Sequence, residues 1–370
     1  MPLLPHFTGS YLSRLASIRI PAIHRTRRIF SVAVLLVVAL NVCGASTRTK
    51  TDVVYMLNGD KITCEIQSLS QGQLSVKPDY TDSSIVIDWT KVARLESTQQ
   101  FVVTDPHGAI FVGALAGDAR QRSVIVVMEK SATLPQDSVI EIAELGSTFV
   151  RRLSGNITLG ATIARAEGDR NFSLQTGVLY RDKRNYASID SSTQFSAQKQ
   201  ASSTNETSVR TAAFEQMRKT QWYAGAIANF LSSSEQQIAL QSTYGAAVAR
   251  RLIFTNKTNL SAIGGLGYTH QQNASGSAGP ARRNSLDSAF AIKYSTFRFD
   301  KATFATALWL YPSLSSPGHL RLTLNQNVYY KFVGNLYVSV NFWDNFDNQP
   351  VPGAPENNLG ATTGVGWSFP

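Results

Sequence analysis

From residue 153 to the end, the chain alternates between hydrophobic and polar positions in long segments, most of them 11–14 residues. Strict alternation is typical of strands with two different faces, and no stretch here has a helical period. Globular strands usually have about five or six residues, whereas a tilted membrane-spanning strand needs about 9–11. We predict twelve strands, at about 154–166, 171–181, 185–198, 205–218, 221–231, 238–250, 257–270, 285–299, 301–311, 318–331, 335–346 and 358–369.

The alternation separates two kinds of face within single segments. Leu322 and Leu324 share one face of the tenth segment, and Arg321, Thr323 and Asn325 share the other. A barrel that contacts lipid outside and water inside has this pattern, with the polar residues turned inward. Arg321 is therefore expected to face the interior.

Aromatic residues gather near the segment ends, where the interfacial girdles of a membrane barrel lie. The residues we expect in these girdles are Trp222, Phe230, Trp309, Tyr311, Tyr329, Tyr330, Trp367 and Phe369. Glu215 and Lys293, in contrast, fit neither face of their segments well.

The connections between segments alternate in length. Those after even-numbered segments are short, such as "DKRN", "FTN" and "FDK", whereas most after odd-numbered segments are longer, including 271–284 and 347–358. Outer-membrane barrels combine tight periplasmic turns, longer external loops and an even strand number. The sequence predicts an all-β fold with a twelve-stranded antiparallel transmembrane β-barrel over 147–370. A soluble β-sandwich is the alternative.

The last segment ends in an apolar, aromatic face formed by Val365, Trp367 and Phe369. The final strand of a barrel must pair with the first, because no backbone group can stay unsatisfied in lipid. We predict that these three residues are the signal read by the barrel-assembly machinery. Glycines occupy the opposite face, and we expect them to leave the inner wall uncrowded and let the strand bend.

Two shorter β units precede the barrel, at about 52–97 and 99–145. Their late segments match at a spacing of 47 residues, which pairs Val92 with Val139. "NGD" and "PHG" provide turns between short alternating strands in corresponding places. We predict a β domain over 46–146 made of two repeated, strongly bent sheets packed in tandem. A generic hairpin pattern is the alternative explanation.

The first 45 residues have the features of a secretory signal peptide. "RTRR" precedes the apolar run 29–40, and small residues allow cleavage after Ala45. An uncleaved membrane anchor is the alternative, and a lipoprotein attached through Cys43 is less well supported because Val42 precedes it. After cleavage Cys64 would be the one cysteine left, and we expect a buried thiol there.

The charge composition limits which classes of partner the protein is expected to bind. Charged residues make up 16% of the chain, and the net charge is +10. Residues 147–370 hold 21 basic and 12 acidic side chains, whereas 46–146 hold 9 and 13. No Lys/Arg run or nucleic-acid motif accompanies the basic excess, so we expect no nucleic acid partner. Outer-membrane lipid, lipopolysaccharide or anions in a channel suit it better.

Several stretches resemble the DUF-481 family, the YdiY-like salt-induced outer-membrane proteins. They include "DVVYMLNGDKITCEI", "SIVIDWTKVARLE", "ITLGATIARAEGDRNFSLQTGVLY" and "FWDNFDNQP", in the family's order over about 52–369. The chain departs from the family at Asp169, where asparagine is usual, and at Phe346–Pro350, where Tyr-Asp-Ser-x-Pro is usual. The resemblance implies a barrel in the outer membrane of a Gram-negative bacterium, with the N-terminal domain in the periplasm. It supplies no catalytic residues.

The best catalytic candidate in the sequence is "GYTHQQNASG" (267–276), which looks like the active-site stretch of outer-membrane phospholipase A. That pattern needs a serine two residues after the histidine, but Gln272 follows His270 there, and Ser275 has the wrong spacing. The remaining histidines and cysteines are too scattered for a metal site. We therefore expect no catalytic residue, no metal and no cofactor. A narrow passive channel or an envelope-structural protein is expected, with a receptor or adhesion surface on the external loops as the alternative and a lipid hydrolase third.

Overall fold

The computed structural model describes residues 50–81, 83–118, 122–127, 131–145, 149–164, 169–182, 184–198, 201–217, 220–297, 302–333 and 335–369. The chain divides into Met1–Thr47 and Arg48–Pro370, and all the described residues belong to the second unit. The predicted signal peptide and its cleavage residue Ala45 lie outside the described residues. Within the described ranges, no helix is both long and apolar enough to cross a membrane.

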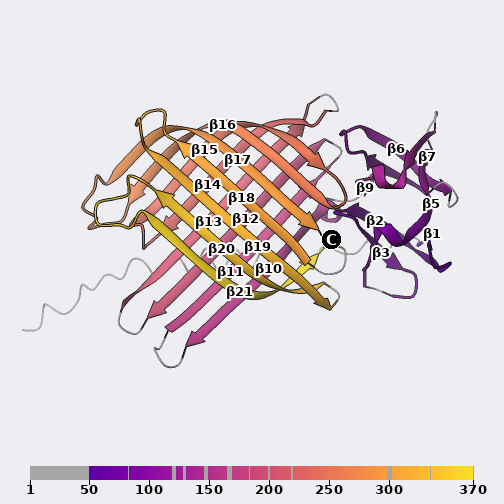
Figure 1. Cartoon of the computed structure of the whole chain (residues 1–370), viewed down its shortest axis with the longest axis horizontal. Helices are drawn as coiled ribbons and strands as arrows, with labels where there is room; N and C mark the ends of the chain where they lie inside the picture. Colours follow the sequence, from indigo (N-terminus) through magenta and orange to yellow (C-terminus); the bar gives the residue numbers. More distant parts are fainter. Residues whose placement is uncertain are drawn as a thin grey trace, which may run out of the picture. The chain divides into compact units, whose positions relative to one another are not determined.

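The first part of the described chain folds into one nine-stranded sheet, coloured indigo to purple in Figure 1. Its path runs β4-β3-β2-β1-β5-β6-β7-β8, with β9 paired to β2 and β5. The strands are β1 (Asp52–Met56), β2 (Lys61–Ser70), β3 (Gln73–Pro78), β4 (Ile85–Asp88), β5 (Val92–Thr104), β6 (Ile110–Asp118), β7 (Ser123–Val127), β8 (Ala132–Pro135) and β9 (Glu141–Glu144).

This single sheet corrects the expectation of two separate sheets. β5 is 13 residues long, and it is shared between the two halves. Its first half pairs with β1, through Val53 and Glu96, and its second half pairs with β6 and β9 through Val102. No turn interrupts β5, so one strand joins the two halves, although its pairing with β6 shifts register between Ser97 and Phe101.

Two 3-10 turns at matching positions in the two halves of the sheet are joined by hydrogen bonds. In η1 (Trp89–Lys91), the indole Nε1 of Trp89 donates to the carbonyl oxygen of Gln136 in η2 (Gln136–Ser138), at 3.0 Å. The Gln136 side-chain amide donates in return to the carbonyl oxygens of Trp89 and Val92, each at 2.8 Å. The partners are 47 residues apart, which is the spacing of the sequence repeat. A true duplication of the two units stays a prediction.

The strands of the sheet enclose one continuous apolar core. Cys64 is fully buried in it, as predicted, and Trp89 is 2% exposed. Its buried residues also include Val54, Ile66, Leu69, Leu74, Val76, Leu95, Phe101, Val103, Leu115, Val126 and Ile142.

The second part of the chain is a closed barrel of twelve strands, as predicted (Figure 1). Each strand pairs antiparallel with the next, and β21 returns to β10, so the described barrel wall has no free edge. After η3 (Phe149–Arg152), the strands are β10 (Leu153–Ala164), β11 (Asp169–Arg181), β12 (Asn185–Gln198), β13 (Ala201–Gln216), β14 (Trp222–Ser233), β15 (Ile238–Phe254), β16 (Thr258–Asn273), β17 (Arg282–Phe297), β18 (Ala302–Pro312), β19 (Leu320–Val333), β20 (Leu336–Asp347) and β21 (Asn357–Phe369).

The barrel is apolar outside, and its buried polar side chains point inward. Leu159, Val248 and Ile292 point outward and are 54%, 43% and 53% exposed, whereas inward Thr158 and Gln241 are buried. A soluble protein buries its large hydrophobic side chains instead. The faces of this barrel therefore have the arrangement expected of a wall whose solvent is lipid.

Some predicted girdle residues lie inside the barrel instead. Trp309 and Tyr311 are 2% and 5% exposed, because they stand in register with inward Thr323 and Arg321 on β19. Tyr329 lies on the same inward face of β19. The other expected girdle aromatics lie on the outward face: Trp222, Phe230, Tyr330, Trp367 and Phe369.

The two charged residues that fitted the sequence alternation poorly point to opposite sides. Lys293 faces inward, in register with Ser261 on β16 and Ala307 on β18. Glu215 is exposed and faces outward at the end of β13. Each takes the side that its parity along the strand dictates, so neither interrupts the barrel.

The glycines of β21 do not leave the inner wall uncrowded. A side chain at Gly360 would collide with the ring of Trp343, and one at Gly366 with the ring of Tyr337. From β20, Tyr337 reaches across Gly366 to β10, where its hydroxyl lies 2.6 Å from Thr158 Oγ1. The glycines therefore make room for aromatic rings that cover the closing seam from inside.

Candidate functional site

The interior of the barrel has two unlike walls. Along β13 to β18, an apolar cluster is formed by Phe214, Tyr223, Ile227, Ala247, Ile263, Ala289, Ala291, Trp309 and Tyr311. Along β10 to β12 and β19 to β21, the inward residues are mostly amides and hydroxyls, such as Gln175, Ser192, Asn325 and Asn341. Alternation along each strand allows this, because one face can change character while the other stays apolar toward lipid.

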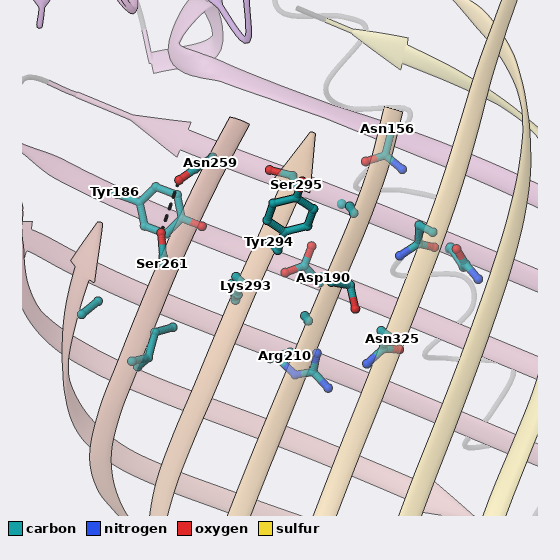
Figure 2. A pocket seen from close by; sticks show the side chains of 18 of the residues that line it. Asn156, Tyr186, Asp190, Arg210, Asn259, Ser261, Lys293, Tyr294, Ser295 and Asn325 are labelled. Atoms are coloured by element: carbon teal, nitrogen blue, oxygen red, sulfur yellow. Dashed lines mark hydrogen bonds between the residues drawn. The ribbon is translucent and has the colours of Figure 1, made fainter. Parts of the chain in front are cut away.

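A cavity of about 400 Å³ lies between these walls, toward the end of the barrel that carries the short turns. Its lining includes the cationic residues Arg210, Arg251 and Lys293 and the carboxylate of Asp190. Figure 2 shows Asp190, Arg210 and Asn325 pointing into this space from different strands. The lining therefore combines positive charge, amides and aromatic rings.

Two of these cations converge on one ring. The guanidinium carbon of Arg210 lies 5.6 Å from the ring centre of Trp309, and the ammonium of Lys293 lies at the same distance. Arg210 comes from β13 and Trp309 from β18, which are not neighbours, so this contact crosses the interior. Cations within about 6 Å of an indole face are attracted by its quadrupole.

A second set of contacts crosses the interior at the end with the longer loops. Asn345 Nδ2 on β20 donates to Glu206 Oε1 on β13 at 2.9 Å, and Asn358 on β21 also donates to this carboxylate. Gln236 Nε2, from the loop after β14, donates to the Asn345 carbonyl oxygen at 3.1 Å. The cavity here is only about 40 Å³. The contacts of Glu206, Asn345 and Gln236 therefore narrow the loop end of the interior.

The predicted inward position of Arg321 is confirmed. Its guanidinium is paired with Asp287 and also donates to Thr269 Oγ1 at 2.9 Å. Nearby, His319 Nε2 lies 2.8 Å from Asp347 Oδ1. All five residues are buried, so this network is part of the barrel interior.

The predicted assembly residues lie together on the outward face of β21. Val365, Trp367 and Phe369 stand opposite Leu159, Ile157 and Gly155 of β10, at the closing seam. The Trp367 and Phe369 rings are 5.6 Å apart. Their role in assembly stays a prediction.

The histidine of the phospholipase-like stretch lies near the loop end of the outer wall. His270 Nδ1 is 2.6 Å from Asn284 Oδ1 on the neighbouring strand. The position two residues later is Gln272, whose amide is not a nucleophile. In the described part of the chain, no group of three or more His, Cys, Asp and Glu residues is placed to hold a metal ion.

The sequence analysis did not single out Glu206, Arg210, Trp309 or Lys293 as a site. One sequence signal was available. A charged residue that lies an even number of positions from an inward polar residue on the same strand must also point into the interior. Which of them meet across the barrel depends on strand number and stagger, so parity alone could not pair β13 with β18 or β20.

Comparison with known proteins gives faint structural likenesses. The translocator domain of the autotransporter NalP from Neisseria meningitidis aligns with 59% of this chain and 87% of its own, at 14% identity and a TM-score of 0.35. A porin aligns with 59% of this chain and 99% of its own, at 10% identity and 0.29. The CymD monoaromatic hydrocarbon channel aligns with 59% of this chain and 87% of its own, at 9% identity and a TM-score of 0.27. Likenesses this weak add nothing to what the barrel's own geometry shows.

No curated protein matches the chain. A family match is clear, and it covers residues 157–369, which is more than half of the sequence and nearly the whole barrel. It agrees with the motifs that the barrel strands carry. The chain belongs to the family described as protein of unknown function, DUF481.

Proposed function

We propose that this protein is an outer-membrane barrel that provides a narrow, anion-preferring passage, with residues 46–146 forming a periplasmic domain. The outward apolar wall and the inward polar wall support the membrane setting. The observation that carries the proposal is the excess of cations in the interior cavity, where Arg210, Arg251 and Lys293 face Asp190. Positive charge in a confined, low-dielectric space concentrates anions.

Two features make the passage narrow. Twelve strands give a barrel well below the width of the 16–18-stranded porins. In addition, Arg210 reaches Trp309 across the middle, and Glu206 reaches Asn345 across the loop end. Only small solutes would move past these contacts, and only when the side chains rearrange.

The partners follow from the same geometry. The outward face suits outer-membrane lipid and lipopolysaccharide, and the strand β21 suits recognition by the barrel-assembly machinery. The loops 274–281 and 348–356 remain the place for the alternative function, a receptor or adhesion surface. They are shorter than the sequence suggested, because the flanking strands extend further toward the loop end.

Planar bilayers test the proposal. We expect purified protein to give small conductance steps, and a KCl gradient to give a reversal potential with the sign of chloride selectivity. Clear cation selectivity contradicts the anion-preferring passage. A complete absence of conductance, with folded protein inserted, favours the envelope-structural function.

We further propose that the protein is not an enzyme. His270 and Asn284 lie together near the loop end of the outer wall, but Gln272 cannot attack an ester. An ester-hydrolysis assay on the folded protein should therefore give no activity above background. Hydrolysis that disappears in His270→Ala would contradict this and support the lipid hydrolase.

A further inference from the structure

We infer that the 400 Å³ cavity is a binding site for a small organic anion, a carboxylate or phosphate carried on an apolar body the size of a single ring. The inference deepens the proposed function, since it names the class of solute that the passage would hold. Binding is nevertheless measured without conduction, so the two can fail separately.

Two cations of the cavity, Arg210 and Lys293, are available to a ligand. Within the described residues, neither Arg210 nor Lys293 has an ion-pair or hydrogen-bond partner, and each lies over the Trp309 ring instead. The Nε of Arg210 is buried without an acceptor. Buried donors that lack acceptors are costly, and an oxyanion placed here would supply them.

The carboxylate of Asp190 does not cancel these charges. It stands in register with Arg210 on the neighbouring strand, yet the two side chains form no ion pair within 4.0 Å. Asp190 lowers the local positive potential while leaving the guanidinium uncovered. Its removal should therefore strengthen anion binding.

One side of the cavity is suited to an apolar body. Phe214, Tyr223 and Ile263 belong both to the cavity lining and to the apolar cluster. Flat aromatic and branched aliphatic side chains give a ring-shaped ligand area to bury, which favours it over a bare ion.

The opposite side is suited to polar substituents. Asn156, Asn325 and Asn341 line it, and the Oδ1 atom of Asn327 is buried without a donor. Figure 2 shows Asn156 and Asn325 on this side of the space. An apolar wall, a few placed polar groups and a volume between about 300 and 1,000 Å³ are typical of small-ligand sites.

Titration calorimetry on the full-length protein in detergent tests the inference. The probes are phenyl phosphate, inorganic phosphate and phenol. We expect phenyl phosphate to bind most tightly, inorganic phosphate more weakly, and phenol without detectable heat. Absence of phenyl phosphate binding at millimolar concentration overturns the inference, and so does equal binding of phenol.

Variants locate the site. We expect Arg210→Gln and Lys293→Gln each to weaken phenyl phosphate binding about tenfold, as loss of one charge-assisted contact implies. Asp190→Asn should strengthen it. Arg282→Gln, at an exposed position at the start of β17 that is not part of the cavity lining, should leave it unchanged. If Arg210→Gln fails to fold, Arg210→Lys replaces it in the experiment. Lysine keeps the positive charge, so this variant should retain part of the binding.

The outcomes separate the inference from the proposed function. Binding that is unaffected by both Arg210→Gln and Lys293→Gln overturns the inference, even if the barrel conducts chloride. Binding that these variants weaken supports the site, even if bilayers show no conductance and the passage fails.

Discussion

Glu206 on β13 accepts a hydrogen bond from the side-chain amide of Asn345 on β20, at 2.9 Å between nitrogen and oxygen, although the two strands are not neighbours. Asn358 on β21 donates to the same carboxylate. The contact therefore joins two walls of the barrel where the longer loops begin.

Glu206→Ala removes this connection, and we expect it to raise single-channel conductance. The reason is that two amides lose their shared acceptor, so the side chains that cross the loop end are no longer joined. Glu215→Ala is the matched control, because Glu215 is on the same strand but faces outward. Unchanged conductance in Glu206→Ala would show that the passage is closed elsewhere.

Arg321 and Asp287 form an ion pair inside the barrel, with 10% and 1% of their side chains exposed. Arg321→Met leaves a buried carboxylate without its cation, and we expect the free energy of unfolding to fall by about 3–5 kcal/mol. Urea unfolding in detergent measures it. Adding Asp287→Asn should restore much of the loss, and a double variant no more stable than Arg321→Met would contradict this.

Tyr337 covers the closing seam between β21 and β10, with its hydroxyl 2.6 Å from Thr158 Oγ1. Tyr337→Phe should lower the free energy of unfolding by about 0.5–1.5 kcal/mol, the usual contribution of one hydrogen bond.

Gly366→Val should be worse than Tyr337→Phe, because the new side chain would occupy the space of the ring. Thr363→Val, on the outward face of the same strand, serves as control. If Gly366→Val keeps wild-type stability in urea titrations, the ring does not need this space.

Phe369 stands opposite Gly155 at the seam, at the end of the apolar face of β21. We expect Phe369→Ser, or deletion of 365–370, to block membrane assembly and lead to degradation, whereas deletion of Pro370 alone is tolerated. Membrane fractionation with heat-modifiable gel mobility measures assembly. Normal levels of assembled Phe369→Ser would mean that this face contributes only to packing and is not an assembly signal.

The nine-stranded sheet has its own apolar core, so residues 48–145 should fold when expressed alone. Circular dichroism should give a β-rich spectrum, and a random-coil spectrum would show that the domain needs the barrel. In this fragment, Trp89→Ala should lower the free energy of unfolding by about 3–5 kcal/mol, because a buried aromatic ring is lost. Tyr80→Ala is the control, since Tyr80 is 76% exposed.

The sequence alone determined the strands and their faces. Alternation has a period of two, so a strand such as β12 (Asn185–Gln198) can be located from its own residues. It also assigned Arg321 to the interior and Val365 to the outside, because each stands in an unambiguous run of polar or apolar neighbours. Loop lengths then gave the even strand number and closure.

Only the tertiary structure decided which residues meet inside the barrel. Arg210 and Trp309 are 99 positions apart and belong to strands five steps apart around the wall, and their contact depends on strand tilt and stagger. The contact of Tyr337 with Gly366 depends on the register between β20 and β21, which alternation within either strand does not set. Periodicity fixes the side to which a residue points, because that is a local property of the backbone. Its partner across the interior is set by the closure of the whole sheet.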